Sequence, residues 1–334
     1  MANINNQLQK SWKSDSCKVP ILKLNNGQLM PQQGLGTFLI PKDNLGDTIA
    51  KAYDLGYRKL DTAWRYYNEK EIAKALKEHN IPREEMFITT KVNADALYLG
   101  RYHGGKYRYF NIRVKSIKKA IEESFTNLGF DYIDLFLVHT PWPVYPDMYE
   151  ALTDFYHQGR IRSIGVSSFL PPMIESLKDV SDVMPAVNQF EISPLNTQKK
   201  LIKYCQDKGI VAEAMSTFSH FRSVEPRQEV VENPVLIKLA EKYGKSVVQI
   251  VLRWLIQQGV SIIPKTWNPQ HLEDNISIYD FSLSDEDMTI IDSLDEGKFL
   301  NYNPYGLMYS IPKKYRGWSA KDWHEKTVWR SRWR

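Results

Sequence analysis

Eight short apolar runs, separated by segments with helical periodicity, are the feature of this sequence that most limits its fold. Apolar residues recur at helical spacing most clearly in Val114–Leu128 and Val247–Gln257. Strands that alternate with helices build parallel sheets, so the pattern predicts an α/β fold. The predicted strands are residues 34–38, 59–63, 87–92, 132–139, 163–167, 186–190, 211–215 and 261–265.

The length of 334 residues suits either one large barrel or two smaller domains. No linker rich in Gly, Ser or Pro divides the body, which favours a single domain. Residues 21–30 predict a β-hairpin, because two apolar runs flank the turn sequence Asn25-Asn26-Gly27. The polar residues 1–18 before it predict a flexible leader.

Polar residues stand at or just beyond the ends of three successive predicted strands. Asp61 lies in the second strand with Tyr66 shortly after it, Lys91 lies in the third, and His139 ends the fourth. Each residue alone has an ordinary structural explanation, and Asp61 with Thr62 could simply cap the helix that starts near residue 68. In a parallel barrel, however, these strand ends converge on the face where active sites lie.

Together these four side chains could transfer a proton to a carbonyl group. Tyrosine is a weak acid, with an unperturbed pKa of about 10. A neighbouring ammonium lowers that pKa, and a carboxylate would hold the ammonium in place. The group therefore predicts Tyr66 as acid, with Lys91, Asp61 and His139 assisting it.

The motifs around these residues resemble those of the aldo-keto reductase superfamily. They read Asp61-Thr62-Ala63-x-x-Tyr66-x-Asn68-Glu69, then Thr90-Lys91, then Asp134-Leu135-Phe136-Leu137-Val138-His139. The resemblance implies a (β/α)8 TIM-type barrel over residues 19–299, with the hairpin closing its bottom and long substrate-side loops. A C-terminal loop and a basic, Trp-rich extension, residues 300–334, follow it. The resemblance also implies NAD(P)H-dependent reduction of aldehydes or ketones to alcohols.

The same resemblance implies a set of cofactor-binding residues. Gly36 and Thr37 would face the nicotinamide ribose, Lys265 and Thr266 would hold phosphate oxygens, and Asp274 and Asn275 would meet the adenine. The other implied members are Asp61, Ser167, Ser168, Gln189, Met215, Ser216 and His271.

Three of these positions depart from the family pattern. Ser168 replaces an Asn that contacts the carboxamide, and Met215 replaces a Tyr that stacks on the nicotinamide. His271 replaces an Arg over the 2′-phosphate, and an unperturbed His is mostly neutral at pH 7. His271 weakens the expected preference for NADPH, whereas Lys265 still favours a phosphate. The expected cofactor is NADPH, with NADH also possible.

The expected substrate pocket contains Phe38, Trp64 and Trp142. Thr140 stands where the family often has a Trp. Two further segments border the pocket if the resemblance holds there: the aromatic-rich loop 93–112 and the tail after Gly297. Otherwise they are surface segments without a role in the pocket.

Charge is concentrated in the last 22 residues. Residues 313–334 carry eight Lys or Arg and two acids, a net charge of +6 against +5 for the whole sequence, so the rest of the chain is not basic. Basic residues among tryptophans can bind single-stranded nucleic acid or anionic lipid. A tail whose tryptophans pack on the barrel is the interpretation we favour, so no nucleic-acid or membrane partner is expected.

The remaining features predict a cytoplasmic enzyme. Cys17 and Cys205 are too few for a disulfide framework and lack metal-ligand spacing, and no signal peptide or membrane-length apolar stretch is visible. We expect a monomer or weak oligomer without a metal, acting on a small-molecule carbonyl substrate. The alternative is a nicotinamide-sensing or partner-binding module with little turnover, which the departures from the family pattern leave open.

Overall fold

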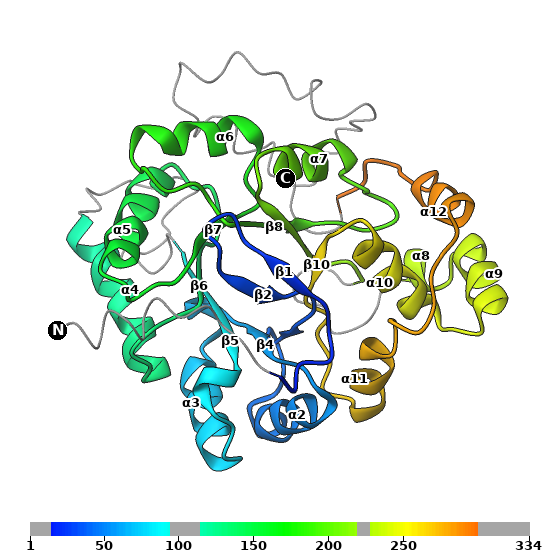
Figure 1. Ribbon diagram of the computed structural model, residues 1–334, viewed down its shortest axis with the longest axis horizontal. Coiled ribbons are helices and arrows are strands. Elements are labelled where there is room, and N and C mark those ends of the chain that lie inside the picture. The colour runs from blue at the N-terminus through cyan, green and yellow to red at the C-terminus, as the bar shows by residue number, and fades with distance from the viewer. Residues whose placement is uncertain (1–14, 94–113, 219–227, 300–334) are drawn as a thin grey trace, which may run out of the picture.

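The computed structural model describes residues 15–93, 114–218 and 228–299. Eight parallel strands form one sheet in which the order in space follows the order in sequence, from β3 to β10 (Figure 1). The strands are β3 (Leu35–Gly36), β4 (Lys59–Asp61), β5 (Phe87–Val92), β6 (Leu135–Val138), β7 (Ile164–Ser167), β8 (Val187–Glu191), β9 (Val211–Met215) and β10 (Ser261–Ile262).

The first and last strands also meet, which closes the sheet into a barrel. Gln33 and Ile262 form a parallel bridge. The Gly34 amide donates to the Ile262 carbonyl at 2.9 Å, and the Gly36 amide donates to the Pro264 carbonyl at 3.2 Å. The predicted (β/α)8 barrel is therefore confirmed.

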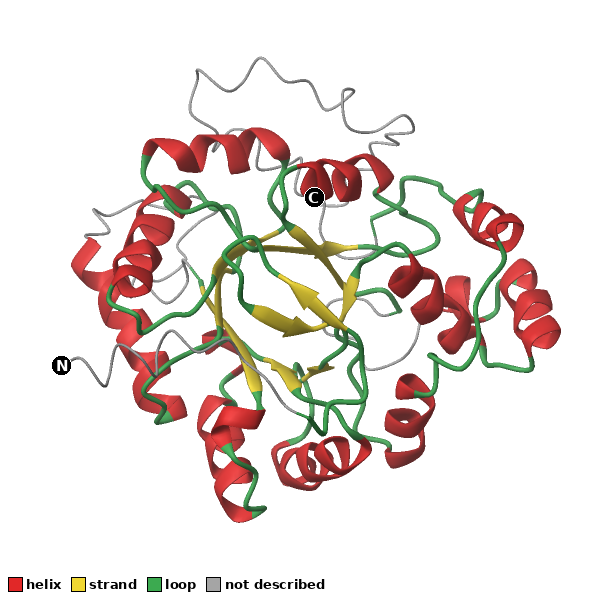
Figure 2. Cartoon of the chain, viewed as in Figure 1, coloured by secondary structure: helices red, strands yellow, loops and turns green. Residues whose placement is uncertain are grey.

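Helices surround the strands, as the red ring around the yellow strands of Figure 2 shows. The helices are α2 (Lys42–Leu55), α3 (Glu69–Glu78), α4 (Val114–Leu128), α5 (Tyr145–His157), α6 (Pro171–Ser176), α7 (Lys199–Asp207), α8 (Gln228–Val231), α9 (Pro234–Tyr243), α10 (Val247–Gln257), α11 (Pro269–Ile276) and α12 (Asp285–Asp292). Short 3₁₀ turns lie at η1 (Trp64–Tyr66), η2 (Arg83–Glu85) and η4 (Leu177–Asp179).

Two helices have the bounds that the sequence predicts. The apolar positions of α4 that point inward, such as Ile117 and Ile121, are fully buried. Helix α10 begins at a capping box, in which Ser246 and Gln249 each accept a backbone amide of the other. Periodicity and capping are both local, so the sequence alone suffices to place these elements.

Each predicted strand overlaps an observed strand, although several observed strands are shorter and β8 runs one residue beyond its predicted end, to Glu191. The clearest case is β10, which ends at Ile262 instead of residue 265. Pro264 has no backbone N–H to donate, so the hydrogen-bonded ladder cannot continue through it.

The hairpin covers the amino-terminal end of the barrel. Strands β1 (Ile21–Lys23) and β2 (Leu29–Pro31) pair antiparallel and cross the barrel in Figure 1. Leu24 and Met30 join an apolar cluster with the lower interior of the barrel, namely Phe87, Leu135, Leu137, Ala186 and Val187. The bottom of the barrel is therefore plugged by apolar side chains, as expected.

The last part of the predicted leader contacts the barrel. The Lys18 amide donates to the Gly56 carbonyl at 3.2 Å, and the Ser16 hydroxyl accepts from Arg58 at 2.6 Å. Residues 1–14, most of the predicted loop 93–112, and the extension 300–334 lie outside the described residues. Within the described ranges, no helix combines the length and apolar character that a membrane span needs.

Candidate active site

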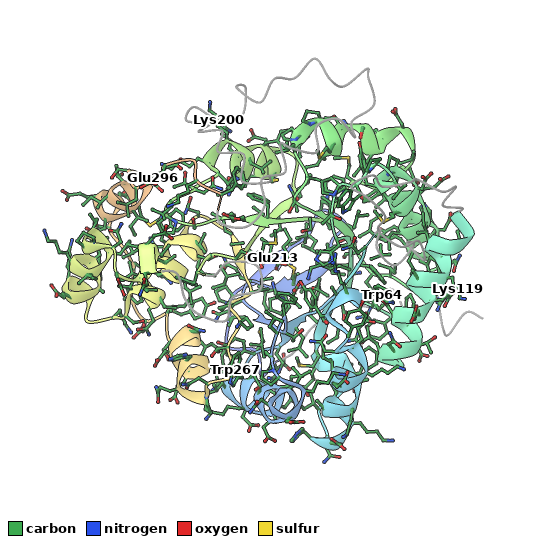
Figure 3. The ribbon with its side chains drawn as sticks, turned by 180° about the vertical axis from the view of Figure 1, so that it is seen from behind. Trp64, Lys119, Lys200, Glu213, Trp267 and Glu296 are labelled. Atoms are coloured by element: carbon green, nitrogen blue, oxygen red, sulfur yellow. The ribbon has the colours of Figure 1, made fainter. Side chains whose placement is uncertain are left out.

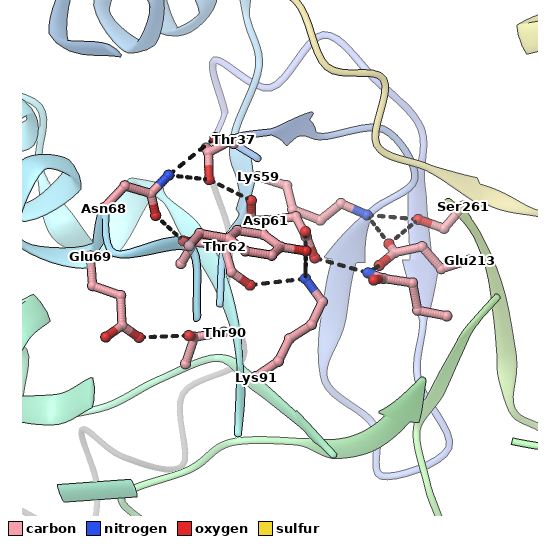
Figure 4. A network of polar contacts seen from close by, with 12 residues as sticks. Thr37, Lys59, Asp61, Thr62, Asn68, Glu69, Thr90, Lys91, Glu213 and Ser261 are labelled. Carbon is pink, nitrogen blue, oxygen red and sulfur yellow. Dashed lines mark hydrogen bonds and ion pairs between the residues drawn. The ribbon is translucent and has the colours of Figure 1, made fainter. Parts of the chain in front are cut away.

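The centre of the site is an ion pair between two neighbouring strands. Asp61 ends β4 and Lys91 lies near the end of β5, and Lys91 Nζ lies 2.6 Å from Asp61 Oδ1. The same ammonium donates to the Thr62 carbonyl at 2.9 Å. Both side chains are almost completely buried, so the pair sits in a region of low dielectric. Figure 4 shows this pair at the middle of a polar network.

The turn that carries Tyr66 is fixed by buried hydrogen bonds. The Asn68 amide donates to the Thr37 carbonyl and hydroxyl at 3.1 Å, and its oxygen accepts from the Thr62 hydroxyl at 2.6 Å. Thr37 in turn donates from its hydroxyl to the Asp61 carbonyl at 2.9 Å. These contacts hold the segment between β4 and α3, so the position of Tyr66 relative to Asp61 is set by the fold.

Tyr66 lies against the ammonium of the pair. Its hydroxyl is 3.5 Å from Lys91 Nζ, and its ring packs against Phe38 at a centroid distance of 4.6 Å. Burial raises the pKa of the Tyr66 phenol by more than the nearby Lys91 charge lowers it. Lys91 thus lowers the pKa of Tyr66, as the sequence predicts, but burial, which the motif does not reveal, leaves the net pKa above its usual value.

His139 lies directly after β6 and faces Tyr66 edge-on, with ring centroids 5.7 Å apart. Burial, together with the positive charges of Lys91 and Arg65, keeps the pKa of His139 well below its usual value. The ring is therefore neutral at physiological pH. Its Nδ1 is buried without a hydrogen-bond partner among the described residues, so the other ring nitrogen is available to carry the proton.

Lys91 stays protonated within the ion pair. Burial lowers the pKa of Lys91, but the Asp61 carboxylate opposes it strongly enough that the net pKa lies above its usual value. Asp61 shows the reverse balance, because burial raises its pKa against the influence of Lys91. Lys91 is therefore a permanent positive charge beside the phenol.

Five expected nicotinamide residues lie on the next three strands or directly after them. Ser167 ends β7 and aligns with Gln189 of β8, and Met215 ends β9. The Ser168 amide donates to the Gln189 carbonyl at 2.8 Å, while Ser168 itself is held at φ +62°. Ser216, which follows Met215, also has a positive φ, at +56°. Left-handed backbone at Ser is uncommon, whereas Asn tolerates it better.

An unsatisfied hydroxyl marks this part of the barrel. Ser167 Oγ is buried and has no hydrogen-bond partner in the described ranges. Buried polar atoms in native structures usually have a partner, so an orphan hydroxyl indicates a missing one. A cofactor amide would supply it, and the residues present therefore fit a nicotinamide carboxamide.

The expected phosphate residues lie around the start of α11 (Pro269–Ile276). Lys265 lies over the Trp267 ring at 4.9 Å, and Thr266 is buried with its hydroxyl accepting from the Asn268 amide at 3.1 Å. His271 is exposed in the first turn of the helix.

Asp274 and Asn275 follow one turn later in α11. Asp274 is half-buried and accepts from the Gln270 amide at 2.9 Å. Asn275 is buried and its carbonyl accepts from the Gln33 amide at 2.9 Å. The structure therefore places the expected phosphate and adenine residues along α11 and in the segment that leads into it.

Gly36 has a role that the resemblance did not suggest. A Cβ at this position would lie 2.7 Å from the Ile263 carbonyl oxygen. Glycine is thus needed here for the close approach of the first and last strands, whatever the cofactor requires.

The expected pocket aromatics lie around Tyr66 and β6. The Phe38 ring packs against the Tyr66 ring. Trp64, labelled in Figure 3, begins η1, and its ring lies 5.8 Å from the Tyr67 ring between centroids. Trp142 is half-buried and packs against the main hydrophobic core.

Sequence reasoning missed two charged residues inside the barrel. Lys59 of β4 and Glu213 of β9 form a completely buried ion pair at 2.6 Å, with Glu213 near the centre of the molecule in Figure 3. The available signal was a charged residue inside an apolar strand run, which only a buried partner permits. Among the described residues, no cluster of three His, Cys, Asp or Glu is arranged to hold a metal ion.

Comparison with known proteins defines the class. The family model for the aldo/keto reductase family matches residues 33–296. The glyoxal reductase of Bacillus subtilis is 38% identical over 293 residues, which cover 86% of this chain and 97% of that protein.

Solved structures agree with the sequence comparison. A crystal structure of an aldo/keto reductase from Brucella melitensis matches with a TM-score of 0.73 and 35% identity, covering 83% of this chain and 100% of the other. A Bombyx mori aldo-keto reductase, solved in complex with NADP, matches with a TM-score of 0.72 and 33% identity, covering 84% and 94%. The fold and its relatives define an NAD(P)H-dependent oxidoreductase. The chain belongs to the aldo/keto reductase family, so the resemblance inferred from the motifs is confirmed.

Proposed function

We propose that the four residues around the buried ion pair carry out proton transfer during reduction of an aldehyde or ketone. The observation that carries this proposal is the position of Lys91 Nζ, 2.6 Å from Asp61 Oδ1 and 3.5 Å from the Tyr66 hydroxyl. Tyr66 donates the proton to the carbonyl oxygen, and Lys91 stabilises the phenolate that remains. Asp61 holds Lys91 in place, and neutral His139 donates a hydrogen bond that orients the carbonyl.

The protonation states suit the reductive direction. The raised pKa of Tyr66 keeps the phenol protonated at neutral pH, as a proton donor must be. The lowered pKa of His139 keeps the imidazole neutral, so it can orient a carbonyl without adding a second full charge beside Lys91.

The proposed cofactor residues would hold a dinucleotide along the carboxyl end of the barrel. A reduced nicotinamide supplies the hydride when bound. Ser167, Ser168 and Gln189 would bind its carboxamide, and Met215 would lie against its ring through the polarizable sulfur. Gly36, Thr37, Asp61 and Ser216 complete the nicotinamide end of the proposed set.

At the other end, Lys265, Thr266 and His271 would bind phosphate oxygens and Asp274 and Asn275 the adenine. NADPH is the proposed cofactor and NADH a possible second one. The direct test of the proposed activity is a panel of aldehydes and ketones, assayed with both cofactors by the loss of nicotinamide absorbance.

Position 271 tests the proposed phosphate end. With a histidine there, we expect NADPH to bind only modestly more tightly than NADH. His271→Arg should tighten NADPH by about tenfold and leave NADH nearly unchanged, because a guanidinium grips a 2′-phosphate through paired, charge-assisted hydrogen bonds. The measurement is the dissociation constant of each cofactor with each protein at fixed salt. Equal changes for both cofactors would show that position 271 does not face the 2′-phosphate.

We propose that the pocket beside Phe38, Trp64 and Trp142 takes a small carbonyl compound, and that loop 93–112 and the C-terminal extension 300–334 govern access of larger ones. Removal of residues 313–334 should then change the Michaelis constants of bulky aldehydes severalfold and leave that of methylglyoxal within about twofold. Cofactor affinity should stay constant, because its proposed residues lie between Gly36 and Asn275. Kinetic constants for one small and one bulky aldehyde decide this. Lower melting temperature with unchanged selectivity would make the tail a stabilising element instead.

The cytoplasm is the proposed compartment, since the chain has only two cysteines, both unpaired. A monomer or weak oligomer that binds neither nucleic acid nor membranes is the proposed state. Size-exclusion chromatography with light scattering measures the oligomeric state directly.

A further inference from the structure

A second ion pair is buried in the same barrel as the proposed proton-transfer residues. Lys59 Nζ lies 2.6 Å from Glu213 Oε2, and neither side chain is exposed. The Ser261 hydroxyl bonds both partners, at 2.6 Å to Lys59 and 2.7 Å to Glu213. Figure 4 places this group on the side of Asp61 that faces away from Thr37 and Asn68.

The amide of Gln189 joins the two ion pairs. Its Nε2 is 2.9 Å from Asp61 Oδ2 and 2.9 Å from Glu213 Oε1. Ionised carboxylates only accept hydrogen bonds, so both hydrogens of the amide are used and the amide cannot be turned over. The chain of contacts therefore runs without a break from Lys59 through Glu213, Gln189 and Asp61 to Lys91.

Packing alone does not explain the second pair. Apolar side chains of similar volume stabilise a protein interior at least as well as a buried ion pair does. The barrel uses apolar residues in the layer below, and Gly34 is needed to admit Lys59. A Cβ at position 34 would lie 2.6 Å from Lys59 Cε. The fold thus makes room for a charge where a smaller apolar residue would suffice.

The two pairs are also coupled electrostatically. Burial raises the pKa of Glu213, but Lys59 and the surrounding hydrogen bonds more than offset it, so the carboxyl is ionised. That negative charge acts in turn on Asp61 and on Lys91, and raises the pKa of each. A change of charge at Glu213 therefore alters the pKa of Asp61 and of Lys91, and Lys91 contacts Tyr66.

We propose that Lys59 and Glu213 are positioning residues for proton donation by Tyr66. Lys59 fixes Glu213, Glu213 and Gln189 fix the second oxygen of Asp61, and Asp61 then holds Lys91 at the phenol. This inference rests on the proposed function, because it assigns the pair to the same proton transfer.

Three variants test the link: Glu213→Gln, Lys59→Met, and the two together. The readout is the titration of Tyr66 in protein labelled with ¹³C-tyrosine, with the Tyr66 signal assigned by its loss in Tyr66→Phe. Glu213→Gln removes a negative charge and should lower the apparent pKa of Tyr66 by about one unit. Lys59→Met removes a positive charge and should raise it by a similar amount. The double variant restores the charge balance and should titrate like the wild type.

The double variant also tests positioning, because it keeps the charge balance while removing the anchor. Its single-turnover rate of aldehyde reduction should fall about tenfold, with the aldehyde affinity unchanged. An unchanged rate overturns the proposal. The proposal is also overturned if the two single variants shift the Tyr66 titration in the same direction, or if neither of them shifts it. If a single variant does not fold, the double variant decides the question alone.

A buried acid at the other end of the barrel provides the control. Asp134 accepts from Arg83 at 2.7 Å and from Arg162 at 3.1 Å. Asp134→Asn should lower the melting temperature without moving the Tyr66 titration, and a shift of the same size in this variant would count against the proposal. The titration needs no turnover, so a wild-type protein that reduces no carbonyl compound overturns the proposed function while the link between the pairs is still measured.

Discussion

Tyr66→Phe should reduce the rate of carbonyl reduction by about 10²–10⁴-fold, which is the usual contribution of general acid catalysis. The substitution removes only a hydroxyl whose recorded contact, at 3.5 Å to Lys91 Nζ, is long. The ring contacts with Phe38 and His139 remain. Melting temperature and NADPH affinity should therefore stay close to those of the wild type. The measurement is the single-turnover rate with an excess of NADPH.

Tyr67→Phe is the matched control for this prediction. Tyr67 is the next residue and is 68% exposed, and its side chain packs on Trp64 through the ring, so losing its hydroxyl should leave the rate unchanged. A Tyr66→Phe protein that reduces aldehydes within about threefold of the wild-type rate would remove Tyr66 from the mechanism.

Lys91→Met should lose nearly all activity and also a large part of its stability. Breaking one side of a buried ion pair typically costs about 3–5 kcal/mol, since the remaining charge is left without a partner. Here that charge is the Asp61 carboxylate, which would keep its hydrogen bond from Gln189 but lose the one from Lys91. The phenol of Tyr66 would at the same time lose the ammonium that stabilises its conjugate base. The measurements are the rate of reduction and the free energy of unfolding.

The stability lost in Lys91→Met should depend on pH. Burial already raises the folded-state pKa of Asp61, and loss of Lys91 raises it further. A raised folded-state pKa favours the folded protein at low pH, so the deficit of Lys91→Met should be largest at neutral pH and shrink as the pH falls.

A double variant separates folding from catalysis in this experiment. Lys91→Met with Asp61→Asn removes both charges and should recover much of the stability, while activity stays low. Lys70→Met, at an exposed lysine of α3, controls for the loss of a positive charge in general. Wild-type activity in Lys91→Met would contradict the proposed pairing.

Much of this protein could be predicted from its sequence because the deciding features are local. Eight apolar runs between amphipathic segments identified the strands, and α4 and α10 have the predicted bounds. The positions of Asp61, Lys91 and His139 at strand ends pointed to one face, since carboxyl ends of parallel strands converge there. The motif around Tyr66 then led to the family that the comparisons confirm.

Other features depend on contacts between distant segments, and the sequence does not contain them in readable form. Closure of the barrel joins Gln33 to Ile262, and the buried pair joins Lys59 to Glu213 across 154 positions. Which side chains meet inside a barrel follows from strand register and tilt, which set every interior layer at once. The net pKa of Tyr66 likewise depends on burial by residues far away in sequence, which outweighs the expected lowering by Lys91. The sequence therefore determined the class of fold and the chemical groups of the site. Tertiary structure alone decided how those groups are paired, buried and charged, because desolvation and ion pairing arise only when distant strands come together.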